Sequence, residues 1–169
     1  ESRYLNIIGF NINNKTAKLF SAASEVGAII SQSSPDLRNS LRDFGLYLGI
    51  AFQLSDDALD YSSTNDTLGK DIGDDFYEGK ITFPIIAAYR ESSSIEKKVW
   101  EELHTKADKD HDDFAKALEL LGGKNAINIT LEEAKKYGQK AIDALQIFPK
   151  SNIRDALIEG AQFSYNRRS

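Results

Sequence analysis

Three aspartates lie close together near the end of a predicted helix. Asp56 and Asp60 are four residues apart, so a helix places them one turn apart on the same side, with Asp57 beside them. Unpaired carboxylates at this spacing repel one another, and a hard divalent cation relieves that repulsion. Magnesium favours one or two carboxylates together with waters and the phosphate oxygens of a substrate. We therefore predict that Asp56, Asp57 and Asp60 bind Mg²⁺. The alternative is three solvated acids at a helix end.

Lysines that could bind phosphate occur in the loop after the aspartates. Residues 63–80 are polar and rich in glycine, and loops of this length without structure are uncommon unless they are functional. We predict that Lys70 and Lys80 neutralise the charge of a leaving group. Acids of the same loop would order waters on the metal ions; they are Asp74, Asp75 and Glu78. The alternative is a solvated, charged loop.

A second possible phosphate contact precedes the aspartates. Lys15 and Thr16 open an apolar helix, predicted over residues 15–31, and a lysine at the mouth of a helical bundle can reach a phosphate. The alternative is a lysine whose charged end extends to solvent from a buried helix. Because the aspartates lie in the same chain, the phosphate contact is the favoured interpretation.

Apolar residues recur at helical spacing along the whole chain. The helices predicted from this spacing span residues 15–31, 35–62, 82–91, 95–104, 112–121, 130–147 and 152–167. A capping box at Thr130–Glu133 and a serine at position 94 set two of the helix starts. No strand-like alternation occurs, so the predicted fold class is all-α.

Two further features of these helices bear on a binding cavity. The segment 15–31 is apolar nearly all round and should form an interior helix. Gly27, Gly45 and Gly49 would either leave space for an apolar substrate or let helices cross closely. Both alternatives stay open from the sequence alone.

Three segments resemble a known family. They are KTAKLF (15–20), FQLSDDALDY (52–61) and GKDIGDDFYEGKITFP (69–84). In this order and spacing they are similar to the second half of a trans-isoprenyl diphosphate synthase, of the bacterial long-chain polyprenyl or octaprenyl type. The resemblance implies a helical bundle of the isoprenoid synthase type. It also implies a Mg²⁺-dependent homodimer that condenses isopentenyl diphosphate with an allylic prenyl diphosphate.

The resemblance assigns a role to each matching residue. The contacts to the allylic diphosphate would be made by Lys15, Thr16, Gln53, Lys70 and Lys80. Of these, Lys70 and Lys80 would assist catalysis by stabilising the departing diphosphate. Asp56 would bind the metal directly, Asp57 and Asp60 would help through ligands or waters, and Asp75 would act through a metal-bound water.

Part of the family pattern is absent from these 169 residues. The earlier aspartate-rich motif and the basic residues that bind isopentenyl diphosphate do not occur. We therefore expect residues 1–169 to form a single all-helical domain that is the C-terminal portion of a larger one and is inactive by itself. The lack of methionine also suggests a processed fragment or missing residues.

Composition excludes several classes of protein. The 21 Lys and Arg against 26 Asp and Glu give a net charge of −5, which argues against nucleic acid as a partner. No apolar run approaches the ~20 residues of a transmembrane helix, and the first residues do not form a signal peptide. With no cysteine, the chain has no disulfides or thiol chemistry. We expect a cytoplasmic protein.

Three other interpretations fit part of the sequence. A terpene cyclase or squalene-type synthase could share the bundle, but the loop with Lys70 and Lys80 favours a chain-elongating enzyme. A non-catalytic partner subunit that binds prenyl diphosphate is the alternative from another class. Residues 108–119 imitate an EF-hand loop, but Asp113 stands where glycine is required, and the segment after it is helical in pattern.

Overall fold

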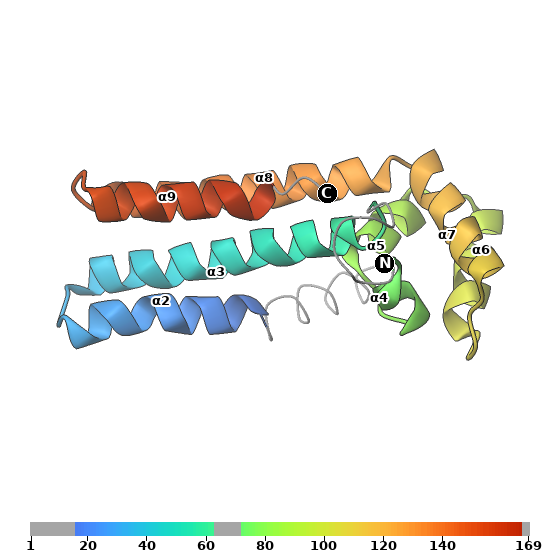
Figure 1. The fold of residues 1–169 in the computed structure, drawn as a ribbon, viewed down its shortest axis with the longest axis horizontal. Coiled ribbons are helices and arrows are strands. Elements are labelled where there is room, and N and C mark those ends of the chain that lie inside the picture. The colour runs from blue at the N-terminus through green and yellow to red at the C-terminus, as the bar shows by residue number, and fades with distance from the viewer. Residues whose placement is uncertain (1–15, 63–71, 167–169) are drawn as a thin grey trace. The chain divides into compact units, whose positions relative to one another are not determined.

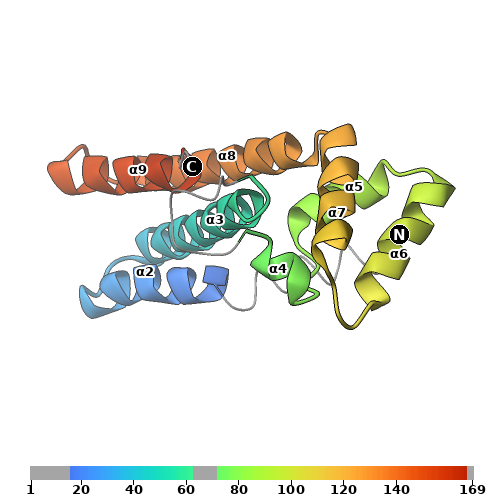
Figure 2. The same ribbon diagram turned by 45° about the vertical axis from the view of Figure 1, so that its right-hand side comes forward.

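The computed structural model describes residues 16–62 and 72–166, and within these ranges it consists of helices, turns and short connections without any strand (Figures 1 and 2). The all-α fold class is confirmed. The helices are α2 (Lys18–Ile30), α3 (Pro35–Leu59), α4 (Asp74–Tyr77), α5 (Phe83–Arg90), α6 (Ser94–Thr105), α7 (His111–Gly123), α8 (Ala126–Ala144), the 3₁₀ helix η2 (Leu145–Ile147) and α9 (Asn152–Tyr165). None of the helices in these ranges is long and apolar enough to cross a membrane.

The chain divides into two compact units. Among the described residues, the first comprises 16–55 and 132–166, and the second comprises 56–62 and 72–131. The long helices α3 and α8 each contribute residues to both units. The prediction that residues 1–169 form a single domain stays a prediction.

In the first unit, α3 lies between α2 on one side and the antiparallel pair α8 and α9 on the other (Figures 1 and 2). Its apolar face packs with α8 and α9 in one core cluster. The buried members of that cluster are Phe44, Ala141, Ile142, Leu145 and Ala161. Burial of this face explains why the spacing of apolar residues predicted α3 so well.

The helices α2 and α3 cross closely at two glycines. A Cβ added to Gly45 would lie 2.7 Å from the carbonyl carbon of Phe20, and one added to Gly49 would lie 2.6 Å from the Cα of Ala17. Gly27 instead faces open space, with nothing within 4 Å of an added Cβ. Of the two alternatives for these glycines, close helix crossing therefore holds for Gly45 and Gly49.

The prediction that residues 15–31 form an interior helix is wrong for this structure. Within α2 only Ala28 is buried, whereas Leu19 is 68% exposed and Ile30 is 77% exposed. Val26 and Ile29 are about half exposed as well. The physical reason is that α3 covers one face of α2, while these apolar side chains project from the rest of its surface.

In the second unit, α5, α6 and α7 pack pairwise on one another around a separate core. Buried residues of this core include Tyr61, Phe76, Trp100, Phe114 and Leu121. Three aromatic rings surround that of Phe114, at centroid distances of 5.5 to 6.3 Å; they belong to Tyr61, Phe76 and Tyr77. This packing fixes the end of α3 and the short helix α4 in the same unit.

Two predicted helix caps and one predicted loop differ from the structure. Ser93, rather than Ser94, caps α6 and forms a capping box with Glu96. The predicted capping box at Thr130 is wrong, because α8 begins at Ala126 and the buried Thr130 hydroxyl donates to the Ala126 carbonyl inside the helix. The helix α4 lies within the segment predicted as a loop.

Candidate functional site

The three aspartates near the C-terminal end of α3 have different surroundings. Asp56 is half-buried, and within the described part of the chain its carboxylate accepts no hydrogen bond and forms no ion pair. Asp57 is only 4% exposed, and its Oδ2 accepts the backbone N–H of Phe83 over 3.2 Å. Asp60 is half-buried, and its Oδ2 accepts the backbone N–H of Asp75 over 3.2 Å. The three side chains are therefore not interchangeable.

Negative charge accumulates around Asp60. Burial, as the largest cause, and the neighbouring charges of Asp75, Asp74 and Asp56 together raise the pKa of the Asp60 carboxyl group to about 6, against the opposing effect of the hydrogen bond from the Asp75 backbone. A carboxylate in this position is costly to ionise without a nearby cation. This end of α3 therefore has the electrostatics of a cation-binding region.

We expect Asp60→Asn to stabilise the metal-free chain at pH 7.5. Between the ordinary Asp pKa of 3.8 and about 6, the folded chain binds more protons than the unfolded chain, so its stability falls as the pH rises through this window. Asparagine removes the charge yet can still accept the Asp75 N–H. Because Asp60 is only partly buried and solvent screens its charge, the expected gain at pH 7.5 is only about 1 kcal/mol.

Urea unfolding in EDTA at pH 3.5 and pH 7.5 would measure this gain. At pH 3.5 the gain should vanish, since the wild-type carboxyl is then protonated in both states. Asp43→Asn is the matched control, because the Asp43 side chain is 43% exposed on α3 and, among the described residues, its carboxylate pairs with the neighbouring Arg42 alone. An equal gain at both pH values would contradict a charge effect at Asp60.

A tight turn connects α4 to the next segment and carries Lys80. The Lys80 Nζ lies 2.7 Å from the Asp75 Oδ1 and 2.7 Å from the Glu78 Oε2, and these hydrogen bonds raise the pKa of Lys80. The turn depends on Gly79, whose φ of 72° lies in the left-handed region that favours glycine. The backbone N–H of Lys80 also donates to the Asp75 carbonyl, so the turn is closed by its own hydrogen bonds.

Gly73 fixes the start of α4 against the aromatic core. Its φ is 85°, and a Cβ added there would lie 2.5 Å from the Phe114 ring. Its N–H donates to the Asp60 carbonyl over 3.0 Å. Asp75, one of the residues predicted to assist a metal through water, is thereby held beside Asp60.

In the first unit the structure brings together two of the residues assigned to a diphosphate. The Thr16 hydroxyl donates to the Gln53 Oε1 over 3.0 Å, from the residues just before α2 to the middle of α3. The predicted contacts Lys15 and Lys70 lie outside the described residues. For Thr16 and Gln53, the close crossing at Gly49 explains the proximity of the two segments.

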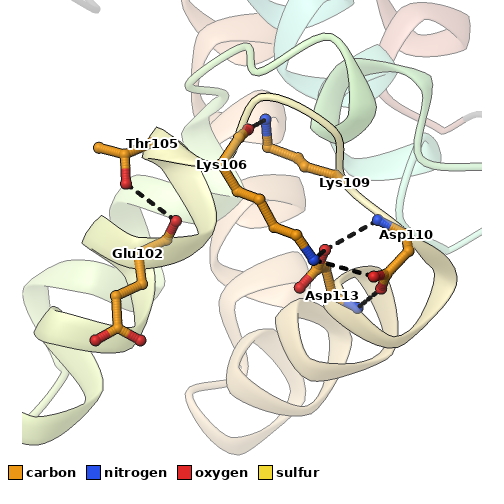
Figure 3. Close-up of polar contacts among 6 residues, drawn as sticks. All are labelled: Glu102, Thr105, Lys106, Lys109, Asp110 and Asp113. Atoms are coloured by element: carbon orange, nitrogen blue, oxygen red, sulfur yellow. Dashed lines mark hydrogen bonds and ion pairs between the residues drawn. The ribbon is translucent and has the colours of Figure 1, made fainter.

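Within residues 16–62 and 72–166, no three acidic or histidine side chains form a ready-made metal-binding group. The EF-hand alternative also fails, because α7 begins at His111 inside the would-be loop. Figure 3 shows that Asp110 and Asp113 form the capping box of α7, with the Lys106 Nζ bound to both carboxylates. The carboxylates of Asp110 and Asp113 thus bind backbone N–H groups and the Lys106 ammonium group.

The sequence analysis predicted no role for two residues of this region, Tyr61 and Thr82. The buried Tyr61 hydroxyl lies 3.1 Å from the Thr82 Oγ1, and either oxygen could donate. Burial raises the pKa of Tyr61, so the phenol stays protonated at neutral pH. The available signal was that Tyr61 follows Asp57 by four residues, which places both on one side of the α3 end.

The comparisons with known proteins give one consistent result. The family model described as Polyprenyl synthetase matches residues 1–121. The octaprenyl diphosphate synthase of Haemophilus influenzae is 35% identical over 99% of this chain and 49% of its own length. The all-trans-nonaprenyl-diphosphate synthase of Rhodobacter capsulatus is also 35% identical, over 99% of this chain and 49% of its own.

Solved structures agree with the sequence relatives. The polyprenyl synthase of Caulobacter crescentus has a TM-score of 0.85 and 46% identity, covering 94% of this chain and 48% of that one. This chain thus spans about half the length of the relatives that it matches. From the extent of the family match and the shared all-helical fold, we conclude that the chain belongs to the polyprenyl synthetase family.

Proposed function

We propose that this chain is the C-terminal portion of a Mg²⁺-dependent polyprenyl diphosphate synthase. The reaction joins isopentenyl diphosphate to an allylic prenyl diphosphate. The observation that carries this proposal is the arrangement at the end of α3, where the Asp56 carboxylate has no partner among residues 16–62 and 72–166 and Asp60 lies beside Asp75. The same turn presents Lys80, so carboxylates and an ammonium group lie in one compact unit.

The chemistry requires little from the protein beyond charge and exclusion of water. The C–O bond of the allylic diphosphate breaks, pyrophosphate leaves with the bonding electrons, and the alkene of isopentenyl diphosphate bonds to the allylic carbon with loss of a proton. Positive charge placed near the leaving group lowers the barrier for the first step. An apolar cavity protects the allylic cation from water. No covalent nucleophile is needed.

The residues at the end of α3 suit Mg²⁺. Magnesium binds one or two carboxylates and completes its shell with waters and phosphate oxygens, so a three-acid cluster is not required. We propose that Asp56 and Asp60 hold the ion and that Asp75 acts through a bound water. Asp57, the third predicted ligand, has one oxygen already engaged by a backbone N–H. Bound there, Mg²⁺ would supply positive charge to the departing diphosphate.

The remaining assignments form part of the same proposal. Thr16 and Gln53 would bind the allylic diphosphate together with Lys15, Lys70 and Lys80. The Caulobacter relative was solved with calcium and isoprenyl diphosphate, which supports a divalent cation and a prenyl diphosphate as ligands of this family. We also propose that the complete enzyme is a cytoplasmic homodimer.

A chimera tests the proposed function directly. Joining this chain to the part of the Caulobacter synthase that it does not match should give magnesium-dependent elongation of labelled allylic diphosphate with isopentenyl diphosphate. The 169-residue chain alone should show little turnover. A folded chimera that binds prenyl diphosphate without elongating it would instead favour the non-catalytic partner subunit.

Lys80→Ala in this chimera should lower kcat/KM for the allylic diphosphate by about 10²-fold, the usual effect of losing one charged group that stabilises a leaving group. Lys70→Ala should have an effect of the same kind. Lys136→Ala is the matched control, since Lys136 is an exposed lysine of α8 paired only with Glu133. Unchanged kinetics for Lys80→Ala would favour the alternative that Lys80 belongs to a solvated, charged loop without a role in the reaction.

A further inference from the structure

The helix α5 depends on an acceptor from another helix at its first turn. Thr82 is its N-cap residue, but the Thr82 side chain makes no capping hydrogen bond. The Phe83 N–H is accepted instead by the Asp57 Oδ2 from α3, at 3.2 Å. Pro84, in the first turn, has no N–H. Asp57 therefore supplies the side-chain cap of α5, and its negative charge suits a helix N-terminus.

A second contact from α3 explains why Thr82 does not cap its own helix. The Thr82 hydroxyl lies 3.1 Å from the Tyr61 hydroxyl, and both residues are buried. Tyr61 is one helical turn beyond Asp57. These two side chains therefore hold consecutive residues, Thr82 and Phe83, against the end of α3.

The same contacts fix the segment that carries Lys80. On its N-terminal side, the Lys80 backbone N–H donates to the Asp75 carbonyl over 2.8 Å, and Asp75 is bound through its own N–H to Asp60. On its C-terminal side, the segment ends at Phe83, which Asp57 holds. The short stretch 80–83 is thus anchored at both ends to α3.

We propose that Asp57 is a positioning residue, which caps α5 and thereby holds Lys80 in its pairing with Asp75, the residue bound to Asp60, and that it is not a metal ligand. This inference rests on the proposed function for the role of Lys80. A side chain that is 4% exposed and bound to a backbone N–H is poorly suited to exchange a metal ion with solvent. Asp56 is half-buried, and its carboxylate has no partner among the residues that the structure describes, so it is well suited to do so.

Four variants of the 169-residue chain separate the two roles: Asp57→Asn, Asp57→Ala, Asp56→Asn and Asp56→Ala. The midpoint of thermal unfolding in EDTA measures how much the Asp57 cap contributes to stability. Electron paramagnetic resonance of Mn²⁺ in the presence of inorganic pyrophosphate measures metal binding. The NMR signal of the ¹³C-dimethylated Lys80 amine reports whether Lys80 keeps its paired environment.

For Asp57→Ala we expect the thermal midpoint to fall by about 3–8 °C, because the part-buried Phe83 N–H loses its acceptor. The Lys80 signal should move towards those of exposed lysines. Asp57→Asn keeps an acceptor oxygen, so it should restore more than half of the midpoint and return the Lys80 signal. Its Mn²⁺ affinity should stay within about threefold of wild type. Both Asp56 variants should lose at least tenfold in Mn²⁺ affinity at an unchanged midpoint.

The result that would overturn the inference is a loss of Mn²⁺ affinity in folded Asp57→Asn as large as that in Asp56→Asn. An Asp57→Asn midpoint as low as that of Asp57→Ala would overturn it too. If Asp57→Ala does not fold, Tyr61→Phe serves instead, and an unmoved Lys80 signal in that variant would count against the anchoring. If the wild-type chain binds no Mn²⁺, the proposed function fails, while the midpoints and the Lys80 signal still decide the role of Asp57.

Discussion

Replacing Asp56 by alanine should lower magnesium-dependent product formation by about 10²–10³-fold in the chimeric synthase, the cost typical of removing one preorganised electrostatic group. The fold should be unaffected, because the Asp56 carboxylate makes no hydrogen bond or ion pair in the described part of the chain. This combination of a large loss in rate with an unchanged thermal midpoint distinguishes a metal ligand from a structural residue.

The assay is product formation from labelled isopentenyl and farnesyl diphosphates, over a range of Mg²⁺ concentrations. Asp56→Ala should require more Mg²⁺ for its residual activity. Asp43→Ala is the control on the same helix, because the Asp43 carboxylate pairs, among the described residues, with Arg42 alone. Near-normal turnover by Asp56→Ala would remove the metal role from this residue, and with it the main support for the proposed function.

The sequence predicted where the aspartates lie but not how they differ. Helical spacing places Asp56, Asp57 and Asp60 close together; Asp56 and Asp57 lie in α3, and Asp60 directly follows it, with its N–H donating to the Asp56 carbonyl. The partners of Asp60 and Asp57, however, are backbone N–H groups of residues 15 and 26 positions later in the chain. No local pattern reports such contacts, because they depend on how the turn after α4 returns to α3.

The sequence predicted the presence of a helix better than it predicted which side chains of that helix are buried. The apolar character of residues 15–31 correctly predicted α2, since any helix with so few polar residues must bury much of its surface to be stable in water. Periodicity does not say which part of a protein covers that surface. In this structure α3 covers one side and leaves Leu19 and Ile30 exposed.

Helix starts were predictable only where a side chain accepts a hydrogen bond from the first turn of its own helix. Ser151 caps α9 by accepting the Arg154 N–H, and α9 begins at Asn152, where the sequence predicted a helix to start. Thr130 has the same chemistry but bonds to the carbonyl four residues earlier, inside α8. A hydroxyl can satisfy either end of a turn, and the preceding Asn125, with a φ of 53°, decides where α8 begins.

Gly45→Ala should destabilise the chain by about 1–3 kcal/mol, as overpacking of a close helix contact does. The added methyl group would meet the backbone of Phe20, which cannot rotate away as a side chain can. Gly27→Ala is the matched control, and we expect it to have the opposite effect on stability. Gly27 lies in α2 with open space around it, so alanine should stabilise the chain by about 0.5–1 kcal/mol through helix propensity alone.

Urea unfolding of both variants of the 169-residue chain would measure these two changes in the free energy of unfolding. The comparison tests more than stability, because the crossing at Gly45 and Gly49 sets the distance between α2 and α3. Separation of these helices should break the hydrogen bond from Thr16 to Gln53, which lies one turn beyond Gly49. If Gly45→Ala were as stable as Gly27→Ala, the two helices would have room to move apart. The Thr16 and Gln53 pair would then lack the rigid support that a diphosphate-binding role requires.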